Sequence, residues 1–71
     1  MNIKVNGEAR TFESELNVTE LLKNEAIEMP EMVSVEVNGE IIDREDFDTT
    51  VVRENDEVEF LYFMGGGAFG I

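Results

Sequence analysis

Apolar and polar residues alternate along the start of the chain, which is the period of a half-buried β-strand. Met1, Ile3 and Val5 are apolar, and the residues between them are polar. Asn6-Gly7 follows directly, and both residue types tolerate the positive φ that a two-residue hairpin turn of type I′ requires. The pattern therefore predicts a hairpin whose second strand runs back over Glu8–Phe12.

A helical period begins at Asn17. Asn17 can accept a hydrogen bond as N-cap, and Glu20 can return one three residues later, as in a capping box. Val18, Leu21, Leu22 and Ala26 then form one apolar stripe. The segment from residue 17 to residue 26 is therefore predicted to be a helix whose stripe lies across the sheet.

A second alternating segment, Val33–Val37, leads into another tight turn at Asn38-Gly39. This pattern predicts a second hairpin, with Glu40–Ile42 as its returning strand. Asp43 follows at a position where it could cap a short helical turn, Arg44–Phe47. The Phe47 side chain would then close the edge of the core.

The last strand is predicted over residues 57–64 and is apolar on both faces toward its end. One face carries Val58, Phe60 and Tyr62, and the other carries Glu59, Leu61 and Phe63. The alternation leaves open which set packs under the helix, although Val58 and Phe60 fit the core better. Leu61 and Phe63 would then lie on the open face of the sheet. Exposed apolar area there either marks a partner site or simply covers the back of the sheet.

The order of elements is hairpin, helix, hairpin, short turn and strand. This order predicts an α+β fold, a mixed sheet of four to five strands with one main helix on one face. If the final strand lies beside the first, the arrangement is the ubiquitin-like β-grasp. Residues 1–64 would form this domain and residues 65–71 a flexible C-terminal tail. The predicted core consists of Ile3, Val5, Val18, Leu21, Leu22, Val35, Val37, Ile41, Phe47, Val58 and Phe60.

The composition narrows the possible functions. The 71 residues include 17 acidic and 5 basic side chains, so the formal net charge is −12. Scarce lysine and arginine argue against nucleic acid and anionic membranes as partners. There is no apolar run of about 20 residues and no signal-peptide core, which predicts a cytoplasmic protein. Because cysteine and histidine are absent, thiol nucleophiles, zinc sites built on nitrogen or sulfur and Ser-His-Asp arrangements are excluded.

The acidic side chains are expected to form mostly a solvated surface, without metal-ligand spacing. They could also speed docking onto a basic partner, an effect that would weaken with added salt. The few arginines stand out against this background. Arg44 and Arg53 are expected to pair with nearby carboxylates.

Two blocks of sequence carry a family resemblance. The first is Val37–Ile42, with Arg44 and Phe47 after it, and the second runs from residue 50 to residue 59 and ends in Phe63–Gly67. Together with residues 1–8 they resemble the ThiS/MoaD family, and within it the ThiS sulfur carriers of thiamine thiazole synthesis. The resemblance covers residues 1–67.

The resemblance implies a carrier that is not itself an enzyme. A ThiF-like adenylating enzyme would use ATP and magnesium to activate the carboxylate of Gly67, and a sulfur-donating enzyme would supply the sulfur that replaces AMP. The thiazole synthase ThiG would then use the thiocarboxylate. The carrier would bind no cofactor or metal. Gly65, Gly66 and Gly67 would enter a narrow channel because glycine has no side chain, and Leu61, Phe63 and Met64 would contact the partner.

The chain departs from the family at its end, because four residues, Ala68–Ile71, follow the glycine triplet. Gly67 therefore has an amide carbonyl where adenylation needs a free carboxylate. We predict a precursor that is cut between Gly67 and Ala68. The resemblance implies that the protease is a metalloprotease of the deubiquitinase type. The alternative is that the extension is tolerated or is read from a misplaced stop codon.

Other functions stay open at this stage. The chain could carry sulfur for another pathway, such as molybdopterin or sulfur amino acid synthesis. It could also be a ubiquitin-like protein tag or interaction module, whose tail forms an amide with lysine or no bond at all.

Overall fold

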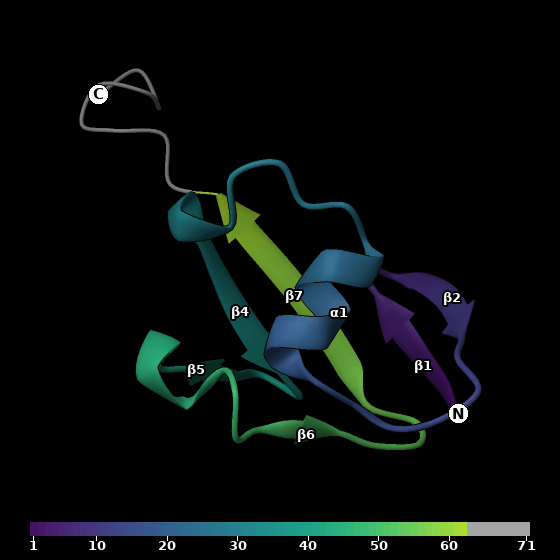
Figure 1. Ribbon diagram of the computed structural model, residues 1–71. Helices are drawn as coiled ribbons and strands as arrows, with labels where there is room; N and C mark the ends of the chain where they lie inside the picture. Colours follow the sequence, from purple (N-terminus) through teal and green to yellow (C-terminus); the bar gives the residue numbers. More distant parts are fainter. Residues whose placement is uncertain (63–71) are drawn as a thin grey trace.

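The computed structural model describes residues 1–62, whose main sheet is mixed and has a helix across one of its faces (Figure 1). The five-stranded sheet has the order β2-β1-β7-β4-β5, and β3 and β6 form a separate two-stranded sheet. The elements are β1 Asn2–Val5, β2 Glu8–Thr11, β3 Leu16–Asn17, α1 Val18–Asn24, β4 Val33–Val37, β5 Glu40–Ile42, β6 Val51–Val52 and β7 Glu57–Tyr62, with 3₁₀ turns at Pro30–Met32 and Arg44–Asp46.

Strand β7 lies at the centre of the sheet, parallel to β1 and antiparallel to β4. The ladder with β1 has only two paired positions, Lys4 with Glu57 and Val5 with Val58. The ladder with β4 has five, from Val33 opposite Tyr62 to Val37 opposite Val58. The last strand therefore lies beside the first, which confirms the predicted ubiquitin-like β-grasp.

Both predicted Asn-Gly turns are present, and each ties its hairpin to β7. Asn6 has φ +52° and Asn38 has φ +53°, each followed by a glycine near +85°, as a type I′ turn requires. The Asn6 side chain accepts a hydrogen bond from the Phe60 amide at 2.8 Å, and the Asn38 side chain accepts one from the Glu57 amide at 2.9 Å. The short parallel ladder is thus extended by a side chain.

Helix α1 begins at the predicted capping box. The Asn17 side chain accepts from the Glu20 amide at 2.7 Å, and the Glu20 carboxylate accepts from the Asn17 amide at 2.9 Å. The helix ends earlier than expected because Ala26 has φ +55°. The Ile27 amide donates to the Leu22 carbonyl and the Ala26 amide to the Lys23 carbonyl, which is the Schellman geometry. Glycine usually occupies that position, so the alanine did not signal the stop, and Ala26 is exposed rather than part of the apolar stripe.

The core lies between α1 and the sheet, and most of its predicted members are buried. Val58 and Phe60 face the helix, at 1% and 7% exposure, which answers the question that the alternation left open. Val33 is also fully buried and was missing from the predicted set, whereas Val37 is only partly buried.

The prediction for Ile41 is wrong. Its side chain is 57% exposed, because residues directly opposite in an antiparallel pair point to the same face. Ile41 is opposite the polar Glu36, whereas Ile42 is opposite the buried Val35. The two-residue turn fixes this register, so it is Ile42 that packs against the core.

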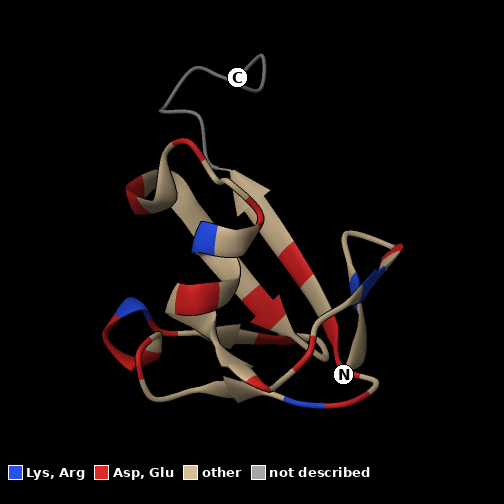
Figure 2. Cartoon of the chain, turned by 45° about the vertical axis from the view of Figure 1, so that its right-hand side comes forward, with Lys and Arg blue, Asp and Glu red and all other residues tan. Residues whose placement is uncertain are grey.

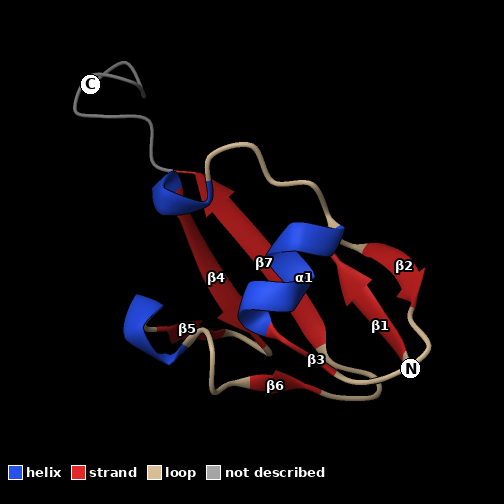
Figure 3. Cartoon of the chain, viewed as in Figure 1, coloured by secondary structure: helices blue, strands red, loops and turns tan. Residues whose placement is uncertain are grey.

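The segment after β5 differs from the prediction in two ways. Asp43 precedes the 3₁₀ turn without a side-chain capping hydrogen bond, although Phe47 is buried at the core edge as expected. Val51–Val52 then pairs with Leu16–Asn17 beneath the helix, a small sheet that the sequence did not indicate (Figure 3). This pairing buries Val52 completely.

Candidate functional site

Leu61 is the one predicted site residue that lies among the described residues. Phe63, Met64, the triplet Gly65, Gly66 and Gly67, and the expected cleavage position at Ala68 lie outside them. The described part of β7 ends at Tyr62, opposite Val33 at one end of the central ladder. Among the described residues, the candidate site is therefore the end of β7 that precedes the glycine segment in the sequence.

Leu61 lies on the open face of the sheet, away from the helix. It is directly opposite Ser34 on β4, and the next pair on the same face is Glu36 with Glu59. Ile41 is opposite Glu36 on the other side and is largely exposed. These five residues, Ser34, Glu36, Ile41, Glu59 and Leu61, are called the open-face patch below. Leu61 itself is half-buried.

The open-face patch joins apolar surface to negative charge. Glu36 and Glu59 face each other across β4 and β7, and within residues 1–62 neither forms an ion pair. Like charges directly opposite in a sheet destabilise the pairing. A cationic group placed on this face would remove that repulsion. The register that places these two carboxylates opposite each other depends on the pairing of strands that are far apart in the sequence. No local sequence pattern therefore predicts it.

The remaining charge is spread widely. Figure 2 shows acidic positions on strands, helix and loops, with few basic ones among them. Arg10 donates to Glu8 at 2.9 Å and to Glu25 at 3.3 Å. The hydrogen bond to Glu8 and the charge of Glu25 raise the pKa of the Arg10 guanidinium.

The two arginines singled out from the sequence behave differently. Arg53 pairs with Glu15 at 3.3 Å, as expected. Arg44 forms no ion pair among the described residues, contrary to the prediction. Its guanidinium donates to the carbonyls of Pro30 and Val33 at 2.8 and 2.7 Å, and it lies 5.3 Å from the centre of the Phe47 ring. Arg44 thus joins the two 3₁₀ turns to the end of the sheet.

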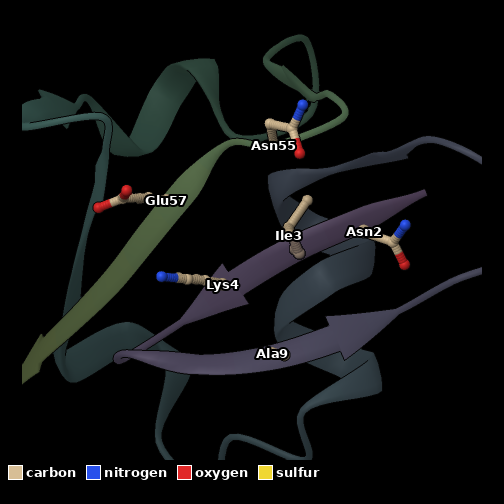
Figure 4. A pocket seen from close by; sticks show the side chains of 6 residues that line it. All are labelled: Asn2, Ile3, Lys4, Ala9, Asn55 and Glu57. Atoms are coloured by element: carbon tan, nitrogen blue, oxygen red, sulfur yellow. The ribbon is translucent and has the colours of Figure 1, made fainter.

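A hollow of about 360 Å³ lies near the start of β1, where Lys4 and Glu57 are among its lining residues (Figure 4). Its charged side chains are Lys4 and Glu57, and the other lining residues are Asn2, Ile3, Ala9 and Asn55. One lysine and one glutamate provide neither a pair of catalytic carboxylates nor a metal-ligand set. Within residues 1–62 no three acidic side chains are placed to hold a metal ion, and no helix is long and apolar enough to cross a membrane.

The fold and the strand leading into a glycine triplet define a class of small ubiquitin-like β-grasp proteins. A model of the ThiS family matches residues 3–67. The chain therefore belongs to the ThiS family.

Solved structures agree with this assignment. The chain is 54% identical to a thiamine biosynthesis protein (ThiS) from Geobacter metallireducens, whose crystal structure it matches with a TM-score of 0.87 over 94% of this chain and 100% of that one. The solution structure from the same organism gives a TM-score of 0.76 at the same identity, over 94% of this chain and 88% of that one. The likeness thus extends over nearly the whole of this chain.

Curated relatives are longer proteins. The chain is 34% identical over 67 residues to a thiazole synthase from Magnetococcus marinus, covering 94% of this chain and 20% of that protein. It is 32% identical over 68 residues to a thiazole synthase from Paramagnetospirillum magneticum, covering 96% of this chain and 21% of that protein. The chain spans about a fifth of the length of these relatives.

Proposed function

We propose that this chain is a sulfur carrier for thiamine thiazole biosynthesis, acts in the cytoplasm and is not an enzyme. The observation that carries the proposal is the family match, which runs to Gly67 and stops before Ala68. A segment like this chain within proteins named thiazole synthase supports ThiG as the partner that receives the sulfur.

The chemistry would take place on the main chain of Gly67. A ThiF-like enzyme binds ATP and magnesium, and the Gly67 carboxylate attacks the α-phosphorus and displaces pyrophosphate. The resulting acyl-adenylate is a better electrophile than a carboxylate, because AMP can leave where oxide cannot. Sulfide-level sulfur from a sulfur-donating enzyme would then attack the acyl carbon, so that a C–S bond forms, the C–O bond to AMP breaks, AMP leaves and a thiocarboxylate remains. The carrier supplies no acid or base, which agrees with a chain that has no cysteine or histidine.

The encoded chain would be a precursor. While the Gly67–Ala68 peptide bond is intact, Gly67 has no carboxylate to adenylate. Hydrolysis of that bond by a metalloprotease would add water across it and free the Gly67 carboxylate. Gly65 and Gly66 would then enter the active site of the ThiF-like enzyme without side chains that could clash there.

The open-face patch is the proposed docking surface for the ThiF-like enzyme, extended by Phe63 and Met64 beyond the described residues. Leu61 supplies apolar area next to the glycine segment, and exposed apolar patches of this kind often mark partner sites. The opposed carboxylates of Glu36 and Glu59 favour a partner with basic groups. Docking would bring Gly67 to the ATP site and reduce repulsion within the sheet.

Mass spectrometry tests the proposal. A chain ending at Gly67, incubated with a ThiF-like enzyme, ATP, magnesium and a sulfur donor, should gain the mass of an adenylate and then exchange one oxygen for one sulfur. The full chain is the matched control and should stay unmodified. Thiocarboxylation of the full chain at Ile71 would contradict the precursor. Transfer of Gly67 to a lysine would make the chain a protein tag instead, and transfer of sulfur to an acceptor other than thiazole would place it in another pathway.

A further inference from the structure

A second concave surface lies on the helix side of the sheet, opposite the open-face patch. This groove of about 310 Å³ lies between α1 and the two 3₁₀ turns, the short blue segments of Figure 3. Its apolar lining includes Leu22, Ile27 and Phe47, and its charged lining residues are Lys23, Glu31 and Arg44. Because most of the lining of this groove is apolar, the groove is suited to an apolar side chain.

The Arg44 wall of the groove is held in place. The guanidinium of Arg44 bonds to the carbonyls of Pro30 and Val33 and lies over the Phe47 ring. Leu22 and Phe47 are 6% and 7% exposed, and both belong to the core. The groove is therefore preformed, and a ligand would not have to order its lining.

Exposed apolar surface connects the groove to the point where the described chain ends. Tyr62 lies opposite Val33, whose carbonyl is bound by Arg44 of the groove wall. Met29, Met32 and Tyr62 are 44%, 40% and 41% exposed, and they are three of the five large apolar side chains exposed among residues 1–62. The apolar surface thus gathers at the end of the sheet from which residues 63–71 continue.

We propose that this groove binds Phe69 of the chain's own extension while the Gly67–Ala68 bond is intact. Six residues separate Tyr62 from Phe69, and an extended segment of that length reaches about 20 Å. Three of the six are glycines, which add no bulk along the route. Attachment to the same chain also gives Phe69 an effective concentration of the order of millimolar, so a weak site would be occupied.

Cleavage after Gly67 would then have a second effect besides freeing a carboxylate. Removal of Ala68–Ile71 would leave the groove empty, so uncleaved and cleaved chains would present different surfaces on the helix side. The open-face patch would be the same in both. This effect of cleavage rests on the proposed function. The docking of Phe69 itself does not depend on whether Gly67 carries sulfur.

Nuclear magnetic resonance on the full chain tests this docking. Phe69→Ser should shift the methyl signals of Leu22 and Ile27, because they lose an aromatic ring stacked on them, and should leave those of Ile41 and Leu61 unchanged. Ile41→Ser is the matched control, since it alters an exposed isoleucine on the other face and should not move the groove signals. Unchanged Leu22 and Ile27 signals in Phe69→Ser would overturn the proposal, as would equal shifts on both faces.

A second measurement uses the free segment. The peptide Gly-Gly-Gly-Ala-Phe-Gly-Ile, added to the Phe69→Ser chain, should restore the groove signals with saturation near millimolar concentration, and the same peptide with serine for phenylalanine should not. No saturable shift with the phenylalanine peptide would contradict docking. Shifts of Leu22 and Ile27 that require a ThiF-like enzyme would assign the groove to that partner instead. Failure of either docking measurement leaves the thiocarboxylation test unaffected, so the two proposals can fail separately.

Discussion

The two faces of the central sheet differ in what they contribute, although the same strands build both. On the helix side, β4 and β7 present Val33, Val35, Val58 and Phe60, none more than 7% exposed. On the open side, the same two strands present Ser34, Glu36, Glu59 and Leu61. The two-residue period of a strand thus separates side chains that hold the fold from side chains available to a partner. A substitution on one face can therefore leave the other intact.

The largest effect is expected on the helix face. Leu21 is completely buried in α1, and Leu21→Ala should lower the free energy of unfolding by about 2–5 kcal/mol through lost burial and a cavity. Ile41→Ala on the open face should change it by less than about 0.5 kcal/mol. Chemical denaturation measures both. A loss below about half a kcal/mol for Leu21→Ala would remove Leu21 from the core and with it the distinction between the faces.

A binding effect is expected next, on the open face. Leu61→Ser should weaken the complex with a ThiF-like enzyme about tenfold or more, as for a residue within an apolar contact, and Phe63→Ser should act in the same direction. Titration calorimetry gives the affinity, and thermal unfolding shows whether the fold is retained. Val51→Ser, at an exposed residue of the small sheet, is the control and should leave the affinity unchanged. Equal affinity for Leu61→Ser and the unaltered chain would place Leu61 outside the interface.

Both faces depend on the position of β7, which the asparagine of the first hairpin turn helps to fix. Asn6→Gly keeps a residue that tolerates φ +52° but removes the acceptor for the Phe60 amide. The loss should be about 1 kcal/mol of stability, the usual contribution of one hydrogen bond. Asn38→Gly provides the parallel case at the second turn. Denaturation curves that coincide with that of the unaltered chain would show that neither side chain supports β7.

Local signals predicted most of this fold, and long-range pairing accounts for what they missed. The alternation at Ile3 and Val5, both Asn-Gly turns and the capping box at Asn17 act within a few residues, so each is readable from sequence. The burial of Val52 depends on a pairing with Leu16, far away in the chain. The helix stops before Ala26, where glycine is the usual residue, so the residue type at this position did not predict the end of the helix.

The candidate site shows the same division. Its location next to the glycine segment followed from the resemblance and from the period of the last strand. Glu36 and Glu59 lie opposite each other because of the β4–β7 register. Arg44 donates to two carbonyls and not to a carboxylate, and both carbonyls belong to residues more than ten positions away in the chain. Spacing along the chain does not encode such contacts, whereas the fold does.

The smallest effect concerns the repulsion across the open face. Glu36→Gln should raise the free energy of unfolding by a few tenths of a kcal/mol, because it removes one of two like charges directly opposite each other. A double-mutant cycle with Glu59→Gln isolates the pair, and the coupling should shrink in high salt. The same Glu36→Gln variant should associate more slowly with a basic ThiF-like partner. A gain in stability without slower association would mean that the carboxylates do not contact the partner, and the proposed docking surface would then depend on the apolar residues Leu61 and Ile41.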